Sequence, residues 1–151
     1  MTPPARTAEQ RKQDVLDRLE NDVDAWVTTA DPASGTPYMV PLSFFWEGAT
    51  LLIATPGGTP TGRNLRSSGK VRLGVGRTRD VVLIEGTAEP VPDEEISEDL
   101  GVAFAAKTGF DPRAQTISYT YFRVRPDRLQ AWREVNELAG RDLMRDGAWL
   151  V

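Results

Sequence analysis

Short apolar and β-branched segments separated by turn signals dominate the first half of this sequence and constrain its fold more than any other feature. Residues 25–30, 38–46 and 49–55 are rich in Val, Thr, Ile, Leu and aromatic side chains. A turn with Pro and Gly at residues 31–35 separates the first two segments, and Glu47-Gly48 separates the second from the third. Strands joined by turns this short pair with their neighbours along the chain, so the pattern predicts an antiparallel meander.

The rest of the chain adds strands to this sheet and helices around it. We expect further strands at residues 70–77, 81–89, 118–125 and 128–135, with a turn at Pro126-Asp127 between the last two. We expect helices from the capping-box pattern at Thr7 to about Glu20, at residues 62–68 with Thr59 or Thr61 as cap, from Pro92 to Lys107, and at residues 136–144. Residues 1–6 are expected to be a loose N-terminus.

These elements predict one mainly β domain over residues 1–151. A chain of this length can bury a single sizeable core. Six or seven antiparallel strands with helices outside are most economically arranged as a small barrel, because closure removes edges that an open sheet would expose.

The chain contains no Cys and no His, which removes several kinds of chemistry. Without Cys there is no disulfide, thiolate metal site or Cys nucleophile. Without His there is no Ser-His-Asp triad and no His-bound metal. We therefore expect no metal site, and no residue stands out as catalytic. Carboxylate, Lys, Tyr or Ser chemistry remains, or a cofactor that brings its own reactivity.

No segment has the features of a leader peptide or a membrane anchor. The N-terminal residues are polar and charged, and apolar runs such as Leu51–Ala54 and Val81–Ile84 are far shorter than the roughly 20 residues of a spanning helix. We expect a cytoplasmic protein.

Positive charge is concentrated in one segment of an acidic chain. Residues 48–79 contain no Asp or Glu but six Lys and Arg, whereas the whole chain has a net charge of −4. The segment therefore carries +6 and the remaining residues carry −10. This asymmetry favours an anionic ligand at the segment, the alternative being ordinary solvated surface charge.

The same segment contains a Gly- and Thr-rich loop, residues 55–62, that opens a short helix. Backbone N–H groups at the helix start, hydroxyls and Arg63 would form a cradle for a phosphate. The loop lacks the Gly-Lys-Ser/Thr ending of a P-loop. A nucleic acid is not expected, because no aromatic side chain lies between Trp46 and Phe104 to stack on bases.

Two further features are candidates for a site. Pro41 interrupts a strand and predicts an edge or a bulge, where backbone groups are free for a ligand; Ser43 lies on the same face. Tyr119 and Tyr121 could donate a proton, although packing is the commoner role of a strand tyrosine.

The order and spacing of several stretches resemble the split-barrel flavoproteins related to pyridoxamine 5′-phosphate oxidase. The stretches are Val40–Phe44, Leu51–Thr55, Thr61–Leu65 and Lys70–Leu73. The ending Leu143–Trp149 is similar to an actinobacterial branch of that family, whose members use FMN or a deazaflavin coenzyme. The resemblance covers roughly residues 10–151, and no single motif in it is diagnostic.

The resemblance implies a six-stranded split barrel that forms a homodimer with two cofactor sites at its interface. The family's phosphate-binding pattern matches Thr55, Thr61 and Arg63, with Gly62 and Asn64 beside them and Lys70 as a further contact. The strand that faces the cofactor ring matches Val40, Pro41, Leu42 and Ser43. The segment around Trp149 would close the site of the neighbouring subunit.

One departure from the family pattern bears on the activity. The oxidase carries a Lys on the ring-facing strand and basic and His residues that hold its substrate, whereas this chain has Leu42, Ser43 and Phe44 there and no His. We therefore expect an oxidoreductase of the reductase kind that acts on an unidentified small molecule. FMN is the first candidate cofactor and a deazaflavin the alternative. Two other functions remain open: a protein that carries the cofactor without turnover, and a partner-binding barrel without ligand.

Overall fold

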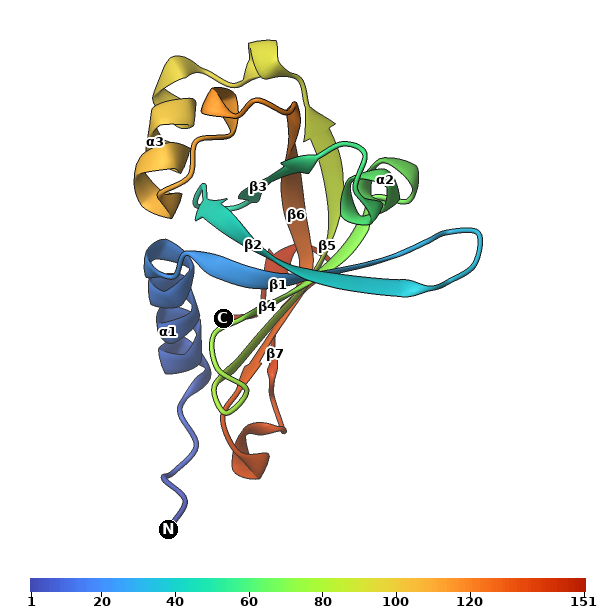
Figure 1. The fold of residues 1–151 in the computed structure, drawn as a ribbon. Helices are drawn as coiled ribbons and strands as arrows, with labels where there is room; N and C mark the ends of the chain where they lie inside the picture. The colour runs from blue at the N-terminus through green and yellow to red at the C-terminus, as the bar shows by residue number, and fades with distance from the viewer.

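Six antiparallel strands close into a barrel in the computed structural model, which describes residues 1–151 (Figure 1). Their order is β3-β2-β1-β4-β5-β6, and a further pairing between β3 and β6 closes the ring. Two short strands, β7 and β8, continue the sheet beyond β6. The predicted mainly β barrel is confirmed. The strands are β1 (Asp24–Ala30), β2 (Pro37–Trp46), β3 (Leu51–Pro56), β4 (Lys70–Val75), β5 (Val81–Val91), β6 (Tyr119–Trp132), β7 (Asp142–Arg145) and β8 (Ala148–Trp149).

Three helices lie outside the sheet: α1 (Ala8–Asn21), α2 (Pro60–Ser67) and α3 (Glu98–Thr108). The predicted cap of α1 is present, since the Thr7 hydroxyl accepts a hydrogen bond from the Gln10 N–H at 3.1 Å. None of these helices combines the length and the apolar character needed to cross a membrane. Short 3-10 turns form at η1 (Asp93–Glu95), η2 (Pro112–Ala114) and η3 (Val135–Glu137).

The core fills the inside of the barrel because alternate residues of each strand face inward. Val27, Phe44, Ile53 and Ile84 are fully buried there, and α2 adds Leu65. A smaller apolar cluster lies outside the barrel, where α3 covers one face of β3 and β6. It consists of Leu52, Ala54, Val91, Phe104 and Tyr121.

The third helix begins later than predicted. We expected it to start at Pro92, but residues 93–95 form a 3-10 turn and α3 starts at Glu98. The Ser97 hydroxyl accepts the Leu100 N–H at 3.1 Å, so Ser97 is the N-cap. The Ser97 hydroxyl accepts a hydrogen bond from an N–H group in the first turn of the helix, which the side chain of Pro92 cannot do. The helix therefore starts after Ser97.

The predicted turn at Pro126-Asp127 is wrong, because β6 runs through it as one strand of 14 residues. Opposite it, Gly86 pairs with Pro126 and Glu85 pairs with Arg128, so Asp127 is an extra residue in the ladder. This is a β-bulge, one of the few positions inside a sheet that tolerate a proline.

The predicted helix at residues 136–144 is also wrong. Only the 3-10 turn η3 forms at its start, and residues 142–145 are strand β7, in which Met144 pairs with Leu129 of β6. Asp146 and Gly147, with φ of 52° and 77°, form the turn that folds β8 back onto β7. Burial of Leu143 and Met144 against the barrel outweighs the helical pattern of this segment.

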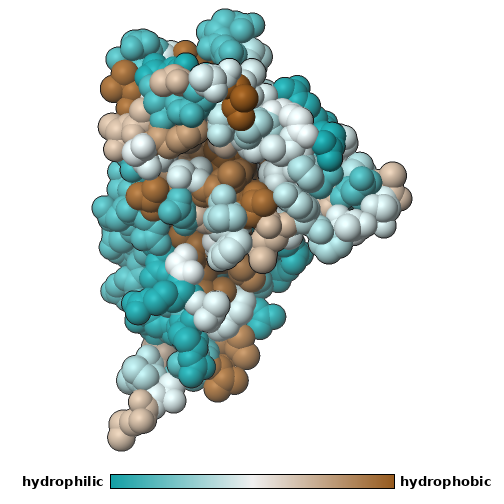
Figure 2. Space-filling view, viewed as in Figure 1, coloured by the Kyte–Doolittle hydropathy of each residue, from teal (hydrophilic) through white to brown (hydrophobic).

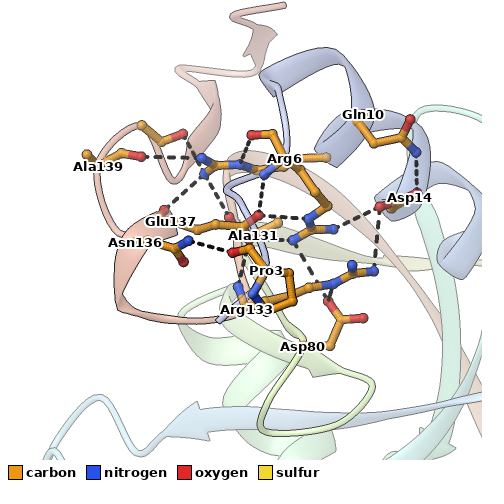
Figure 3. A network of polar contacts seen from close by, with 12 residues as sticks. Pro3, Arg6, Gln10, Asp14, Asp80, Ala131, Arg133, Asn136, Glu137 and Ala139 are labelled. Carbon is orange, nitrogen blue, oxygen red and sulfur yellow. Dashed lines mark hydrogen bonds and ion pairs between the residues drawn. The ribbon is translucent and has the colours of Figure 1, made fainter. Parts of the chain in front are cut away.

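The N-terminal segment is held at Pro3, whose carbonyl oxygen accepts the Asn136 side-chain amide at 2.9 Å, and at Arg6, instead of being loose throughout. Figure 3 shows Arg6 inserted among acidic side chains, with its guanidinium 2.7 Å from Glu137 and 2.9 Å from Asp14. Glu137 also accepts the backbone N–H groups of Arg6 and Arg133, both at 2.8 Å. The buried guanidinium of Arg11 donates beside it to carbonyl oxygens, including that of Glu137 at 3.0 Å. These bonds tie the chain start to the turn before β7.

Candidate anion-binding site

The helix α2 begins directly after the Gly-rich loop and closes one end of the barrel. Thr59 caps it by accepting the Gly62 N–H at 3.1 Å. A Cβ added to Gly62 would lie 2.7 Å from the Pro56 carbonyl oxygen and 3.0 Å from that of Gly57. Only glycine fits there, so the loop and the helix pack backbone to backbone. We call residues 55–64 the cradle.

Threonine hydroxyls line the inside of this cradle. The Thr55 and Thr59 hydroxyls lie 3.2 Å apart, and Thr59 donates to the Pro56 carbonyl oxygen at 2.8 Å. Thr61 is 1% exposed, and its hydroxyl has no hydrogen-bond partner. A buried hydroxyl without a partner is uncommon and marks a place where a further polar atom would be accommodated.

Three cations at the cradle have no carboxylate partner. In the acid-free segment Arg72 forms an ion pair with Glu85, and Arg79 pairs with Glu134 at 3.8 Å. The cations without such a pair are Arg63, Arg66, Lys70 and Arg77, of which the first three belong to α2 and the start of β4. The positive charge at this end of the barrel is therefore available to an outside anion.

Two of these cations are held over the loop. The Arg63 guanidinium donates to the Gly58 carbonyl oxygen. The Arg66 guanidinium donates to the Thr120 hydroxyl of β6 at 3.0 Å. Both side chains are exposed and come from successive turns of one helix, so they present their remaining N–H groups to the same side.

Asn64 links the cradle to the strands that continue from it. Its side-chain amide donates to the Thr29 hydroxyl of β1 at 3.1 Å, and both residues are buried. Thr29 pairs with Tyr38 of β2 in the sheet. The segment of β2 that follows Tyr38, residues 40–43, therefore starts beside the cradle.

This segment of β2 is an open edge, as Pro41 predicts. β3 pairs with β2 only from Phe44 onward, whereas β1 pairs with β2 from Pro37 to Ser43. The Phe44 N–H bonds to Val23 on the β1 side at 2.9 Å. Because backbone groups alternate in direction along a strand, those of Met39, Pro41 and Ser43 point away from β1. The Ser43 hydroxyl donates to Asp24 at 2.8 Å, so this hydroxyl is already engaged within the chain.

Most of the predicted site residues lie together, and one does not. Thr55, Thr61, Gly62, Arg63 and Asn64 form or adjoin the cradle, Lys70 follows it, and residues 40–43 extend from it. Trp149 pairs through β7 with β6 at Leu129, nine residues along β6 from Thr120. At about 3.3 Å per residue this separation is about 30 Å, so Trp149 cannot reach the cradle of its own chain.

Trp149 packs instead against the barrel core of its own chain. The Lys12 ammonium lies over its ring, 4.7 Å from the centroid, and donates to the Val151 carbonyl oxygen at 2.7 Å.

The two tyrosines proposed as proton donors face away from the cradle. Thr120 shares its side of β6 with the core residue Phe122, whereas Tyr119 and Tyr121 point to the other side, toward α3. Arg66 and Thr120, by contrast, belong to the cradle and were not among the predicted residues. A pattern along the chain could not reveal this pair, because it arises only when β3 pairs with β6.

Residues 12–133 match the sequence model of the family named pyridoxamine 5′-phosphate oxidase. The chain belongs to this family. Among curated proteins, none matches the sequence significantly.

Solved structures share the fold at low sequence identity. A Listeria innocua protein that bears the family's name has 17% identity and a TM-score of 0.67, covering 82% of this chain and 98% of its own. An F420 reductase has 21% identity and a TM-score of 0.62, covering 75% and 93%. An FAD-binding protein from Mesorhizobium loti has 19% identity and a TM-score of 0.63, covering 78% and 89%. At these identities the likeness shows the fold alone.

Proposed function

We propose that this chain is a flavin- or deazaflavin-dependent oxidoreductase that acts on a small molecule. The observation that carries the proposal is the cradle of α2, where Arg63, Arg66 and Lys70 lack carboxylate partners beside an open strand edge. A phosphate in the cradle and a flat ring along the edge would use both features at once.

The residues present fit the phosphate of such a cofactor. Arg63 and Arg66 offer guanidinium N–H groups, Lys70 adds an ammonium, and the start of α2 adds backbone N–H groups. The close packing at Gly62 and the partnerless Thr61 hydroxyl are what a tight polar site requires. Each hydrogen bond to a charged group contributes about 1.5–3 kcal/mol, so this anchor would dominate binding.

The open edge of β2 fits the ring. The Pro41 carbonyl oxygen and the Ser43 N–H point away from β1 and can accept from and donate to the ring's polar edge, while the half-buried Val40 and Leu42 supply apolar surface. The cofactor itself supplies the hydride or electron chemistry. This chain binds and orients it and shields it from water.

FMN remains the first candidate and a deazaflavin the alternative. One neighbour is named an F420 reductase and another an FAD-binding protein, which supports the cofactor class without choosing within it. The activity for which the family is named is not proposed, because neither Lys nor His stands on the strand of residues 40–44. The substrate is left as an unidentified small molecule.

A second copy of the chain is part of the proposal. Trp26, Met39 and Leu83 are 51%, 57% and 37% exposed and line an outer hollow of about 360 Å³. Figure 2 shows apolar residues gathered in the middle of the face on which β1, β2 and β4 cross in Figure 1. An exposed apolar patch of this kind suits a protein interface, and a homodimer would bring the partner's Trp149 within reach of the cradle.

Titration of the purified protein with FMN and with a deazaflavin, followed by absorption and fluorescence, tests the function. We expect tight binding of one of them, weakened about tenfold or more by Arg66→Ala, since one charge-assisted hydrogen bond is lost. Arg72→Ala, which removes a cation already paired with Glu85, is the matched control and leaves the affinity nearly unchanged. No binding of either cofactor would overturn the proposal.

The second candidate function is a cofactor carrier without turnover. One observation favours it, namely that no side-chain proton donor lies at the open edge. The Ser43 hydroxyl donates its hydrogen bond to Asp24, and Tyr119 and Tyr121 face α3. Oxidation of the reduced cofactor that depends on an added electron acceptor separates the two functions. A carrier would bind the reduced cofactor without accelerating its oxidation.

A further inference from the structure

A second hollow lies on the other side of β6 from the cradle. It has a volume of about 310 Å³ and lies between η1, the start of α3, η2 and the first residues of β6. Because Thr120 faces the cradle while Tyr119 and Tyr121 line this hollow, neighbouring residues of one strand serve opposite sides. The hollow is therefore separate from the proposed cofactor site.

The Tyr121 hydroxyl is the unusual group at this hollow. Tyr121 is 3% exposed, and its hydroxyl is one of two buried side-chain polar atoms in the structure without a hydrogen-bond partner. Burial raises the pKa of this phenol above its usual value, so it remains protonated at neutral pH. Tyr121 shares the lining of the hollow with the charged residues Asp93, Glu98 and Arg113.

A buried tyrosine hydroxyl without a partner costs free energy unless something pairs with it. Its ring is fixed by an edge-to-face contact with Phe104, at 5.6 Å between centroids. The side chain lies in the wall of the hollow, whose volume suits a small ligand. These two features together indicate a binding site and not a packing defect.

The charges around the hollow indicate the sign of its ligand. Arg113 is the only cation that lines it, and its guanidinium is bound to both oxygens of Asp111, at 2.9 and 3.1 Å. A third N–H group of Arg113 reaches Glu98 at 3.4 Å. Asp93 also lines the hollow, and no Lys or Arg lies within ion-pair distance of it. With its cation neutralised, the site has an excess of acceptors and favours a cation.

Apolar side chains complete the lining. Ile96, Pro112 and Ile117 lie beside the two tyrosines, and Ile117 is 57% exposed. A ligand that matches this lining has an apolar or aromatic body and one positive group.

We propose that this hollow binds a small organic amine, with its ammonium between Asp93 and the Tyr121 hydroxyl and its apolar body against Ile96, Ile117 and Tyr119. The ammonium donates to the Asp93 carboxylate and to the oxygen of the Tyr121 hydroxyl. The site does not depend on the proposed cofactor function and is tested on the protein without cofactor.

Three probes of one shape and different charge test the site: phenethylammonium, 2-phenylethanol and 3-phenylpropionate. Isothermal titration and amide NMR shifts of residues 93–98 and 112–121 report binding and its place. We expect the ammonium to bind at least tenfold more tightly than the alcohol, since a charge-assisted hydrogen bond is gained, and the carboxylate not to bind. Binding of the carboxylate in preference, or of none of the three, would overturn the proposal.

Two variants with matched controls locate the contacts. Asp93→Asn and Tyr121→Phe should each weaken phenethylammonium about tenfold. Glu94→Gln changes the same charge one residue away, outside the hollow, and Tyr38→Phe removes a phenol on β2; neither should alter the affinity. Tyr121→Phe should fold at least as stably as the parent chain, because it removes a buried hydroxyl that has no partner. Equal effects of Asp93→Asn and Glu94→Gln would contradict the site.

Discussion

Gly62 shows how a single residue fixes the geometry of the cradle. A Cβ at this position would lie 2.7 Å from the Pro56 carbonyl oxygen, and that atom is backbone and cannot turn away. We expect Gly62→Ala to destabilise the protein by about 1–3 kcal/mol, because overpacking exceeds the gain of 1 kcal/mol or less from helix propensity. Urea unfolding followed by tryptophan fluorescence measures the change.

The control for this substitution lies in the same loop. A Cβ added to Gly58 meets nothing within 4 Å, so Gly58→Ala should leave the free energy of unfolding unchanged or raise it slightly. If Gly62→Ala were as stable as Gly58→Ala, the loop and the helix would not be packed backbone to backbone.

Glu137 is the residue through which pH should act on stability. It accepts hydrogen bonds from the Arg6 side chain and from two backbone N–H groups, and these lower its pKa from 4.5 to about 2. A lowered carboxyl pKa stabilises the fold above about pH 4.5, and this contribution is lost as the pH falls toward 2. We expect Glu137→Gln to cost about 3 kcal/mol at pH 7, and the difference from the parent chain to shrink as the pH falls.

Thermal unfolding between pH 7 and pH 2.5 checks this expectation. Glu134→Gln is the matched control, since the Glu134 side chain is 41% exposed and lies 3.8 Å from Arg79. It should behave like the parent chain at every pH. A constant difference between Glu137→Gln and the parent chain across this range would show that the carboxylate charge is not what stabilises the fold.

At the level of elements, turn chemistry decided which predictions from the sequence succeeded. Strands β1 to β5 follow alternating patterns bounded by Gly and Pro, and the structure places them within a few residues of the expected ranges. The same rule failed at Pro126-Asp127, where the residues signal a turn but form a bulge opposite Gly86. A Cβ at Gly86 would lie 2.4 Å from the Arg125 carbonyl oxygen, so the partner strand, distant in sequence, makes the bulge possible.

The part of the candidate site that neighbouring residues form could be predicted from the sequence, and the part that distant residues form could not. Residues 55–64 are adjacent in the chain, and their cradle follows from composition and the start of one helix. Arg66 and Thr120 meet only because β3 pairs with β6, and the distance of Trp149 from the cradle follows from its pairing through β7. Contacts that form only when the barrel closes join residues far apart in the chain, so local sequence patterns cannot predict them.

The start of α3 is open to a direct test at Ser97. If Ser97 is the cap, Ser97→Ala removes the bond to the Leu100 N–H and should destabilise the protein by about 1 kcal/mol. If the helix began at Pro92, Ser97 would lie inside it and alanine would be neutral or stabilising. Chemical denaturation therefore distinguishes the two by the sign of the change. Ser67→Ala, at the exposed last residue of α2, should change the free energy of unfolding by less than about 0.5 kcal/mol.

On the scale of the whole molecule, Trp149 and the cradle, which the family resemblance assigns to one site, are too far apart to meet within a single chain. The cradle lies at one end of β6, and Trp149 attaches near the other end, about 30 Å away by strand length. The exposed patch of Trp26, Met39 and Leu83 offers a face for a second copy. We propose that in a two-fold dimer each Trp149 reaches the cradle of the other chain, so that the proposed site is complete only in the pair.

Mixed dimers test this arrangement. Arg66→Ala damages the cradle, and Trp149→Leu removes the aromatic ring while keeping an apolar side chain; each homodimer should bind the cofactor weakly at both sites. If Trp149 acts across the interface, a mixed dimer of the two variants has one site with both lesions and one with neither. Co-expression with two different tags isolates the mixed dimer, which should bind one cofactor per dimer with the affinity of the parent protein. If Trp149 served its own chain, every site would carry one lesion and no tight binding would return. Because both variants keep the Trp26 patch, the two outcomes differ only in which chain supplies Trp149 to which cradle.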